Sequence, residues 1–197
     1  MIKRFKKYLE KKDLILSPKK SKVMVFERER GRVKKKDWRW GKESIEEVKE
    51  MRYLGYIMQK NGGAEKHIME RIRRATIAMK MTWSIGERVF RDDYIRRIKM
   101  FNALVGSIAL YGAEIWGWNK EERLDRIKRK YVKWILGLDR KTPNYILKEE
   151  TKMRELRMEA MMRAIKYEET ARKTEKKLVV ECIKELERER RSREESK

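Results

Sequence analysis

Residues 61–83 read NGGAEKHIMERIRRATIAMKMTW, and they decide the fold of most of this 197-residue chain. The opening Asn61-Gly62-Gly63 interrupts regular structure, because asparagine and paired glycines favour turns. Directly afterwards, apolar residues recur at the spacing of one helical face. They are Ala64, Ile68, Ile72, Ala75, Met79 and Trp83. The stretch therefore predicts a domain boundary followed by a long amphipathic helix.

The same helical spacing continues toward the C-terminus. Further apolar stripes cover residues 94–108, 124–138, 153–167 and 178–186, with breaks at 86–91 and 117–120. Between two stripes, Thr142 suits a helix N-cap and Pro143 suits the first helical position. We predict a helical bundle over 63–139 and a helical extension over 140–197 that ends in a charged tail.

Upstream of the boundary, the pattern favours short strands. The first twelve residues carry apolar side chains at helical spacing between lysines, which predicts one short helix. Strands are expected at 23–26, 33–40 and 50–58, where β-branched and aromatic residues are frequent. We predict that these strands form a small antiparallel sheet in a region covering 1–62. The expected fold class is α+β and mainly α, a small antiparallel sheet followed by a helical bundle.

The charge of the chain points to a polyanionic partner. Lys and Arg number 55 against 32 Asp and Glu, a formal net charge of +23, and the excess is spread over all three regions. Such a surface binds nucleic acid by releasing its counterions. An anionic membrane is the competing partner, but no apolar run approaches the roughly 20 residues of a membrane span. Without an apolar signal core in the first residues, we expect an intracellular protein of the nucleus or cytoplasm, not a secreted one.

Residue types that carry catalysis are scarce. Cys182 is the single cysteine and His67 the single histidine, so the sequence offers neither an internal disulfide nor a zinc site. Cys182 falls at an apolar spacing and is expected to be a buried structural thiol. The pair Asp92-Asp93 precedes a helical stripe, where acidic residues satisfy free amides, and we interpret it as a helix cap. We predict no catalytic residue and no metal ligand.

Three sequence blocks resemble one family of polymerases. Residues 16–22 read LSPKKSK and run into the apolar residues 23–26, residues 51–56 read MRYLGY, and residues 110–116 read LYGAEIW. Together they resemble the end of the palm and the thumb of reverse transcriptases from non-LTR (LINE-like) retrotransposons. The resemblance covers about two thirds of the chain. Ser17 stands where that family commonly has asparagine.

The resemblance implies a fragment without its catalytic centre. The family's metal-binding aromatic-x-Asp-Asp hairpin should lie upstream of Leu16, where only fifteen residues remain. A palm remnant and a thumb would then have no cofactor of their own, although the full parent enzyme, an RNA-directed DNA polymerase, uses Mg²⁺. An autonomous polymerase would need two-metal carboxylates that the chain does not supply.

The resemblance also implies roles for particular residues. Lys20 and Lys22 map onto a turn that lies near the incoming nucleotide in these polymerases. Tyr53, Leu54 and Gly55 map onto a strand that grips the primer end. The helices from Ala64 onward map onto the thumb, which holds the template and primer duplex.

A basic helical face is the clearest binding candidate from the residues themselves. In the helix predicted over 120–136, Arg126, Arg129, Lys130 and Lys133 fall at i, i+3, i+4 and i+7, away from the apolar stripe. Such a face can follow the phosphates of RNA or an RNA–DNA hybrid without reading bases. The alternative is a solvated charged face.

A second candidate surface combines aromatic and basic residues near the N-terminus. Trp38-Arg39-Trp40 follows Lys34-Lys35-Lys36, as base stacking with phosphate contacts would require. The alternative, which we favour, is a hairpin whose aromatic rings cover the sheet.

A different class of function also fits the sequence. A helical protein retained by the host could use the basic face to bind RNA or chromatin. Its C-terminal helices, over 153–186, would pair with a partner or with a second copy. The apolar heptads there are not sustained, which disfavours a long coiled coil.

Overall fold

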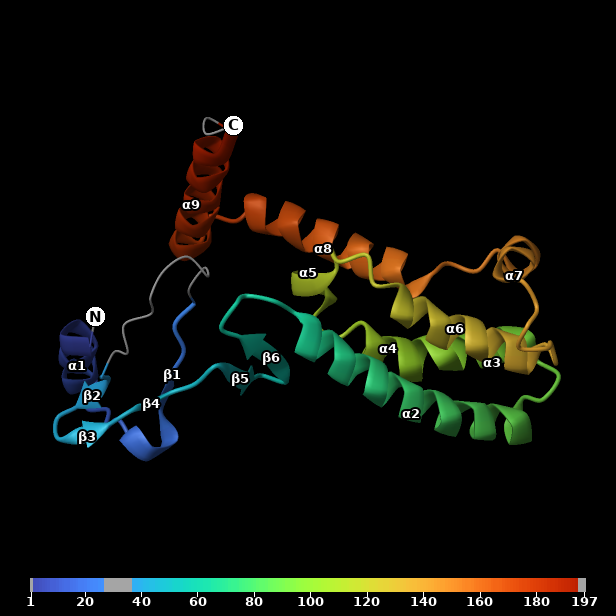
Figure 1. Cartoon of the computed structure of the whole chain (residues 1–197), viewed down its shortest axis with the longest axis horizontal. Coiled ribbons are helices and arrows are strands. Elements are labelled where there is room, and N and C mark those ends of the chain that lie inside the picture. The colour runs from blue at the N-terminus through green and yellow to red at the C-terminus, as the bar shows by residue number, and fades with distance from the viewer. Residues whose placement is uncertain (1, 27–36, 195–197) are drawn as a thin grey trace. The chain divides into compact units, whose positions relative to one another are not determined.

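Helices form most of the computed structural model, which describes residues 2–26 and 37–194 (Figure 1). The chain divides into two compact units, unit 1 at residues 1–69 and unit 2 at residues 70–197, and the division falls inside helix α2. The mainly helical α+β class expected from the sequence is confirmed. The three-region division at 62 and 139 stays a prediction.

Unit 1 combines one helix, a short 3₁₀ turn and short strands in its described residues. These elements are α1 (Ile2–Lys11), η1 (Pro18–Lys20), β1 (Lys22–Val23), β2 (Arg39–Trp40), β3 (Glu43–Ser44), β4 (Glu46–Glu47), β5 (Glu50–Tyr53) and β6 (Tyr56–Gln59). The strands pair two by two, β1 with β4 in parallel and β2–β3 and β5–β6 antiparallel.

This pairing corrects the predicted antiparallel sheet. Within the described residues the strands form separate two-stranded ladders, one of them parallel. The strand predicted at 23–26 is only Lys22–Val23, and the one predicted at 33–40 is only Arg39–Trp40, with 33–36 outside the described residues. The charged residues between 42 and 50 offer no apolar alternation that would set a longer register.

The strand predicted over 50–58 is a β-hairpin. Tyr53 pairs with Tyr56, so Leu54 and Gly55 form a two-residue turn. Their φ angles of 47° and 81° are both positive, as a type I′ turn requires. Glycine reaches this region readily, whereas for leucine it costs about 1–2 kcal/mol.

Few apolar side chains hold the N-terminal part of unit 1 together. Leu9 of α1 and Ile45 are buried. Phe5 meets Trp40 edge-on, with ring centroids 6.2 Å apart, yet Phe5 is 46% exposed. The packing is therefore thin.

The hairpin is fastened to the start of α2 (Glu65–Val89) by a buried histidine. The His67 Nδ1 accepts a hydrogen bond of 3.2 Å from the Ile57 amide, and its ring stacks on Tyr56 at 4.0 Å. The single histidine of the chain thus has a structural partner in unit 1.

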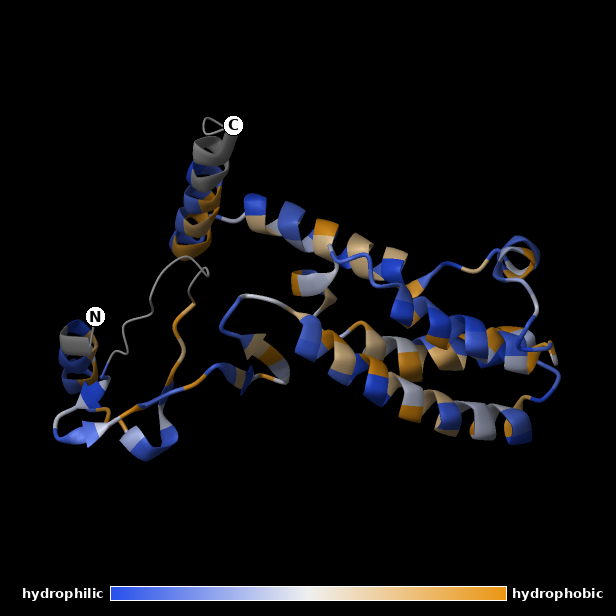
Figure 2. Ribbon diagram, in the orientation of Figure 1, coloured by the Kyte–Doolittle hydropathy of each residue, from blue (hydrophilic) through white to orange (hydrophobic). Residues whose placement is uncertain are grey.

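Unit 2 is a helical bundle built on the rest of α2. Its other elements are α3 (Tyr94–Phe101), the π-helix η2 (Asn102–Gly106), α4 (Ser107–Ala109), α5 (Ala113–Trp116), α6 (Glu122–Ile135), α7 (Asn144–Thr151), α8 (Leu156–Arg172) and α9 (Lys177–Glu194). Hydrophobic residues recur between hydrophilic ones along α2 and α6 (Figure 2). The helices expected at 94–108, 124–138, 153–167 and 178–186 are all present, with shifted ends.

Two predicted helix boundaries are wrong. α2 does not end at Gly86 but continues to Val89. Gly86 packs against α3, and a Cβ atom at this position would lie 2.9 Å from the Met100 methyl carbon. The glycine therefore serves close helix packing instead of ending the helix. The break comes at 90–93 instead. Pro143, expected at the first helical position, is the N-cap residue of α7.

The core of unit 2 is fully buried. The Phe101 and Tyr131 rings pack with centroids 4.7 Å apart, and the Tyr131 hydroxyl donates to the Arg97 carbonyl at 3.3 Å. Other core residues at or below 1% exposure include Val105, Leu110, Leu124, Val132, Leu147 and Leu156.

The segment 110–117 fixes α5 against α8. Trp116 is 2% exposed, and its indole N–H donates to the Tyr111 carbonyl at 3.1 Å. Gly117 lies so close to α8 that a Cβ atom there would meet the Ala160 carbonyl oxygen at 2.2 Å. Trp116 and Gly117 therefore have packing roles.

The last helix exposes its apolar residues. Leu178 and Leu186 are 73% and 66% exposed. Cys182, expected to be buried, is exposed as well, because α9 makes few contacts with α8, among them the ion pair of 3.6 Å between Arg172 and Glu187. None of the described helices is long and apolar enough to cross a membrane.

Candidate nucleic-acid interface

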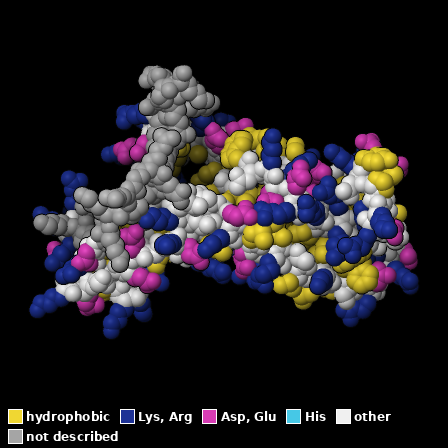
Figure 3. All heavy atoms as spheres, in the orientation of Figure 1, with side chains coloured by type: hydrophobic (Ala, Val, Ile, Leu, Met, Phe, Trp, Pro, Cys, Tyr) yellow, Lys and Arg dark blue, Asp and Glu magenta, His cyan; other side chains and the backbone are white. Residues whose placement is uncertain are grey.

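A basic groove lies along α6 in unit 2. Its volume is about 570 Å³, and its lining consists of Glu122, Arg126, Arg129, Lys130, Lys133, Trp134, Leu138, Arg140 and Asn144. Lysine and arginine side chains cover the part of the surface over α6 (Figure 3). All four basic residues predicted from the 120–136 helix line this groove.

The sequence of α6 explains why these side chains face outward. Leu124, Ile127 and Tyr131 are buried and recur at helical spacing, so they hold one face of α6 on the bundle. The basic residues fall between them in the sequence and lie on the opposite side of the helix. The helix itself ends at Ile135, one residue before the predicted end.

The four predicted cations differ in their partners. Arg126 is exposed and makes no hydrogen bond or ion pair with another described residue. The Lys130 ammonium lies 4.8 Å from the centre of the Trp134 ring, a cation–π contact. Both groups point to solvent, so Arg126 and Lys130 can reach a phosphate without breaking a strong contact.

Lys133 and Arg129 are more constrained. The Lys133 ammonium donates to the carbonyls of Arg140 and Thr142 at 3.0 and 2.6 Å, which ties the loop after α6 to the helix. Arg129, with its side chain 21% exposed, lies 3.7 Å from the Glu155 carboxylate. Their positive charge still adds to the potential of the groove.

Arg140 is a member of the groove that the sequence did not indicate. It lies in the loop after α6, outside the helical spacing that singled out the other cations. The Lys133 hydrogen bond to its carbonyl positions it. A basic residue in a short loop next to a basic helix was the available signal, and it is a weak one.

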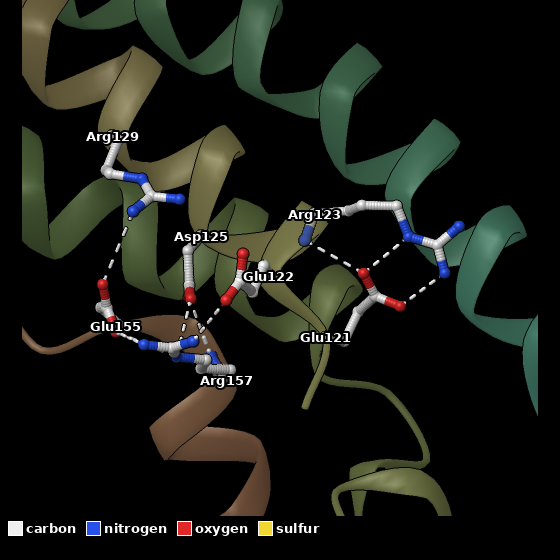
Figure 4. A network of polar contacts seen from close by, with 7 residues as sticks. All are labelled: Glu121, Glu122, Arg123, Asp125, Arg129, Glu155 and Arg157. Carbon is white, nitrogen blue, oxygen red and sulfur yellow. Dashed lines mark hydrogen bonds and ion pairs between the residues drawn. The ribbon is translucent and has the colours of Figure 1, made fainter. Parts of the chain in front are cut away.

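The edge of the groove is anchored by an ion-pair network around Arg157 (Figure 4). Its guanidinium lies 3.2 Å from both Glu122 and Asp125 and 2.8 Å from Glu155. Glu155 also meets Arg129, so the network links α6 to the start of α8. It holds the basic face of α6 in a defined orientation.

Asp125 performs a capping role within this network. Its carboxylate accepts a hydrogen bond of 3.0 Å from the Arg157 amide, an amide in the first turn of α8 that has no partner in its own helix. Burial raises the pKa of Asp125 above its ordinary value, and the hydrogen bond from the Arg157 amide offsets only part of that rise. Asp125 is thus a buried structural acid.

Neighbouring contacts complete this joint. The Lys128 ammonium is buried and donates to the Arg154 carbonyl at 2.7 Å and to Glu159 at 3.1 Å. Glu121 caps α6 by accepting from the Arg123 amide at 3.0 Å. The Arg123 guanidinium beside it lowers the pKa of Glu121 below its ordinary value.

The site residues predicted from the N-terminal blocks lie in unit 1, in separate ladders. Lys20 is exposed at the end of η1, and Lys22 is exposed on β1 with its ammonium 3.2 Å from Glu46. Tyr53 and Leu54 are 55% and 77% exposed at the hairpin turn with Gly55. Lys22 and Tyr53 thus belong to different strand pairs, β1 with β4 and β5 with β6.

The aromatic and basic candidate near the N-terminus is only partly described. Lys34, Lys35 and Lys36 lie outside the described residues. The Trp38 indole N–H donates to Glu47 at 2.8 Å, and Trp40 packs against Phe5. Both rings therefore have intramolecular partners, as the hairpin interpretation expects.

The pair Asp92-Asp93, predicted to be a helix cap, completes an aromatic-x-Asp-Asp tetrapeptide with Phe90 and Arg91, which the prediction did not take into account. It lies in the turn between α2 and α3, and the Asp93 carboxylate accepts from the Arg96 amide at 2.8 Å as the N-cap of α3. The capping role predicted for this pair is confirmed for Asp93. Among the residues described, no group of three or more His, Cys, Asp or Glu is placed to hold a metal ion.

Comparison with protein-family models, curated proteins and solved structures finds no match to this chain.

Proposed function

We propose that this chain is a non-catalytic part of a non-LTR retrotransposon reverse transcriptase that binds the phosphate backbone of RNA or an RNA–DNA hybrid. The observation that carries the binding proposal is the groove along α6, where Arg126, Arg129, Lys130, Lys133 and Arg140 gather. The origin in a polymerase is supported by the three sequence blocks, of which residues 110–116 lead directly into the loop before α6.

The groove is better suited to contact the phosphate backbone of a nucleic acid than to recognise its base sequence. Its free cations, Arg126 and Lys130, are long side chains on a helix surface, and they can neutralise phosphates over a range of positions. Each neutralised phosphate releases counterions, whatever the neighbouring base. We expect similar affinity for strands of different sequence and a steep dependence on salt.

The test is a double substitution of the two free cations, Arg126→Gln with Lys130→Gln. Binding to RNA–DNA hybrid and to RNA should weaken for all sequences alike, and the slope of log affinity against log salt should fall by about 1 for each contact removed. Fluorescence anisotropy at several salt concentrations measures both quantities. Leu124, Ile127 and Tyr131 still supply the packing face, so circular dichroism should be unchanged.

A matched control removes the same charge elsewhere. Lys166 and Lys173 are exposed on α8 and at its end, outside the groove lining. Lys166→Gln with Lys173→Gln should leave the affinity and the salt slope close to those of the parent. Equal effects of the two pairs would show that only net charge matters, and that the groove is a solvated face.

A second function is favoured by the exposed apolar residues of α9. Leu178 and Leu186 would suit the helical RNA- or chromatin-binding protein, whose C-terminal helix pairs with a partner. Sedimentation of the purified chain discriminates between self-pairing and a monomer. Preferential binding to nucleosomes over RNA–DNA hybrid would favour this function over the polymerase origin.

A further inference from the structure

A second cavity of unit 2 lies at the start of α6, and its chemistry differs from that of the basic groove. Its volume is about 390 Å³, within the range of small-molecule sites. Trp118 and Asn119 of the loop before α6 form one wall, and Met158 and Met161 of α8 form another. Lys120 lies on the rim.

Trp118 is unusual among the tryptophans of the chain. All six lie in described residues, and Trp118 alone is largely exposed, at 53%. Trp116, two residues earlier, is 2% exposed and hydrogen-bonded. The burial of Trp116 and the close packing of Gly117 on α8 fix the backbone that presents Trp118 to the cavity.

The cavity and the basic groove are neighbours, joined by one ion pair. Arg157 lines the cavity and Glu122 lines the groove, and the two side chains form an ion pair of 3.2 Å (Figure 4). The cavity is lined from the loop directly before α6 and from α8, and the lining of the groove starts at Glu122, the first residue of α6. The cavity and the groove are therefore adjacent at the start of α6.

We propose that this cavity accepts an unpaired base of a nucleic-acid strand whose backbone lies in the α6 groove, the base stacking on Trp118. This inference rests on the function proposed above and adds a preference for single strands. Base–aromatic stacking accepts every base, because each has a π-face. The thioethers of Met158 and Met161, which line the same cavity, add an adaptable apolar surface.

Charge favours a nucleic-acid occupant over an apolar peptide. Arg157 is paired with three carboxylates, those of Glu122, Asp125 and Glu155, so it offers no free positive charge to a ligand. Lys120 is exposed and, among the described residues, has no ion pair, so it is available to the phosphate beside the stacked base. An aromatic ring with an adjacent free cation is the pairing that single-strand binding sites use.

The experiment compares three probes: a short single-stranded oligothymidylate, an abasic strand of equal length, and a blunt duplex. Trp118→Ala should weaken binding of the oligothymidylate about 5- to 150-fold, the range that follows from the loss of one stacked base. Binding of the abasic strand and the blunt duplex should stay within about 2-fold, because neither offers an accessible base.

Trp118→Phe is the matched variant. It keeps an aromatic face and should retain most of the affinity for the oligothymidylate, while it removes the binding-dependent quenching of tryptophan fluorescence that we expect of the parent. The exposed position of Trp118 makes loss of folding in either variant a minor effect, and circular dichroism checks it.

Two outcomes separate this inference from the function on which it rests. If Arg126→Gln with Lys130→Gln weakens binding of all three probes while Trp118→Ala changes none, the groove stands and the base site is overturned. Salt-independent binding of every probe by the parent protein would overturn the groove and the base site together.

Discussion

Unit 1 and unit 2 differ in how each is held together. In unit 2, Phe101, Leu124 and Tyr131 are fully buried in a bundle whose helices α6 and α8 are 14 and 17 residues long. In unit 1, the ladders are two to four residues long, and Phe5 remains half exposed against Trp40. An isolated two-stranded ladder is marginally stable in water. Unit 2 therefore provides a well-packed base for a binding site, whereas unit 1 has little packing to position one.

The largest expected effect tests this contrast with a pair of phenylalanines. Phe101→Ala removes a ring with 0% exposure and should destabilise unit 2 by about 3–5 kcal/mol. Phe5→Ala removes a half-exposed ring with an edge-on contact and should cost about 1 kcal/mol or less. Denaturant unfolding measures the first, and hydrogen exchange of unit 1 amides measures the second. Equal costs would show that unit 1 is packed as firmly as unit 2.

A second prediction concerns two glycines of unit 2. Gly117→Ala places a methyl group 2.2 Å from the Ala160 carbonyl oxygen, a backbone atom that cannot move alone, and should cost about 3 kcal/mol by overpacking. Gly106→Ala is the control, since the nearest atom to its Cβ is 3.9 Å away, and it should be neutral or stabilising by up to about 1 kcal/mol. Thermal unfolding measures both. If Gly117→Ala left the thermal stability unchanged, α5 and α8 would be packed less closely than the 2.2 Å approach indicates.

The smallest expected effect lies in unit 1, at the hairpin turn. Leu54→Asn puts a residue that tolerates positive φ at the first turn position and should stabilise the β5–β6 hairpin by about 1 kcal/mol. Leu54→Val, with a β-branched side chain in the same conformation, should destabilise it. Hydrogen exchange of the Ile57 and Gln59 amides reports the change. If neither variant altered exchange, the hairpin would be held by the His67 contact and not by its turn.

The sequence predicted unit 2 better than unit 1 for a physical reason. Helical hydrogen bonds are local, so the stripes near 94–108 and 153–167 located helices directly, with errors confined to their ends. Strand pairing joins separate segments, and the spacing of residues 50–58 did not distinguish one strand from a hairpin around Leu54 and Gly55. The parallel pairing of β1 with β4 had no signal in either segment.

The residues of the candidate site were likewise predictable where local spacing determines them and unpredictable where long-range contacts do. Helical spacing alone placed Arg126, Arg129, Lys130 and Lys133 on one side of α6, and composition alone indicated a polyanionic partner. Only the tertiary structure decided which cations are free, because the contacts of Lys133 with the following loop and of Arg129 with Glu155 depend on chain folding back on α6. It also decided that Trp118 faces a cavity floored by α8 while Trp116 is buried. Helical periodicity predicts which residues share a face. The residues that pack against that face come from segments up to some 40 residues away in the sequence, so no local pattern predicts them.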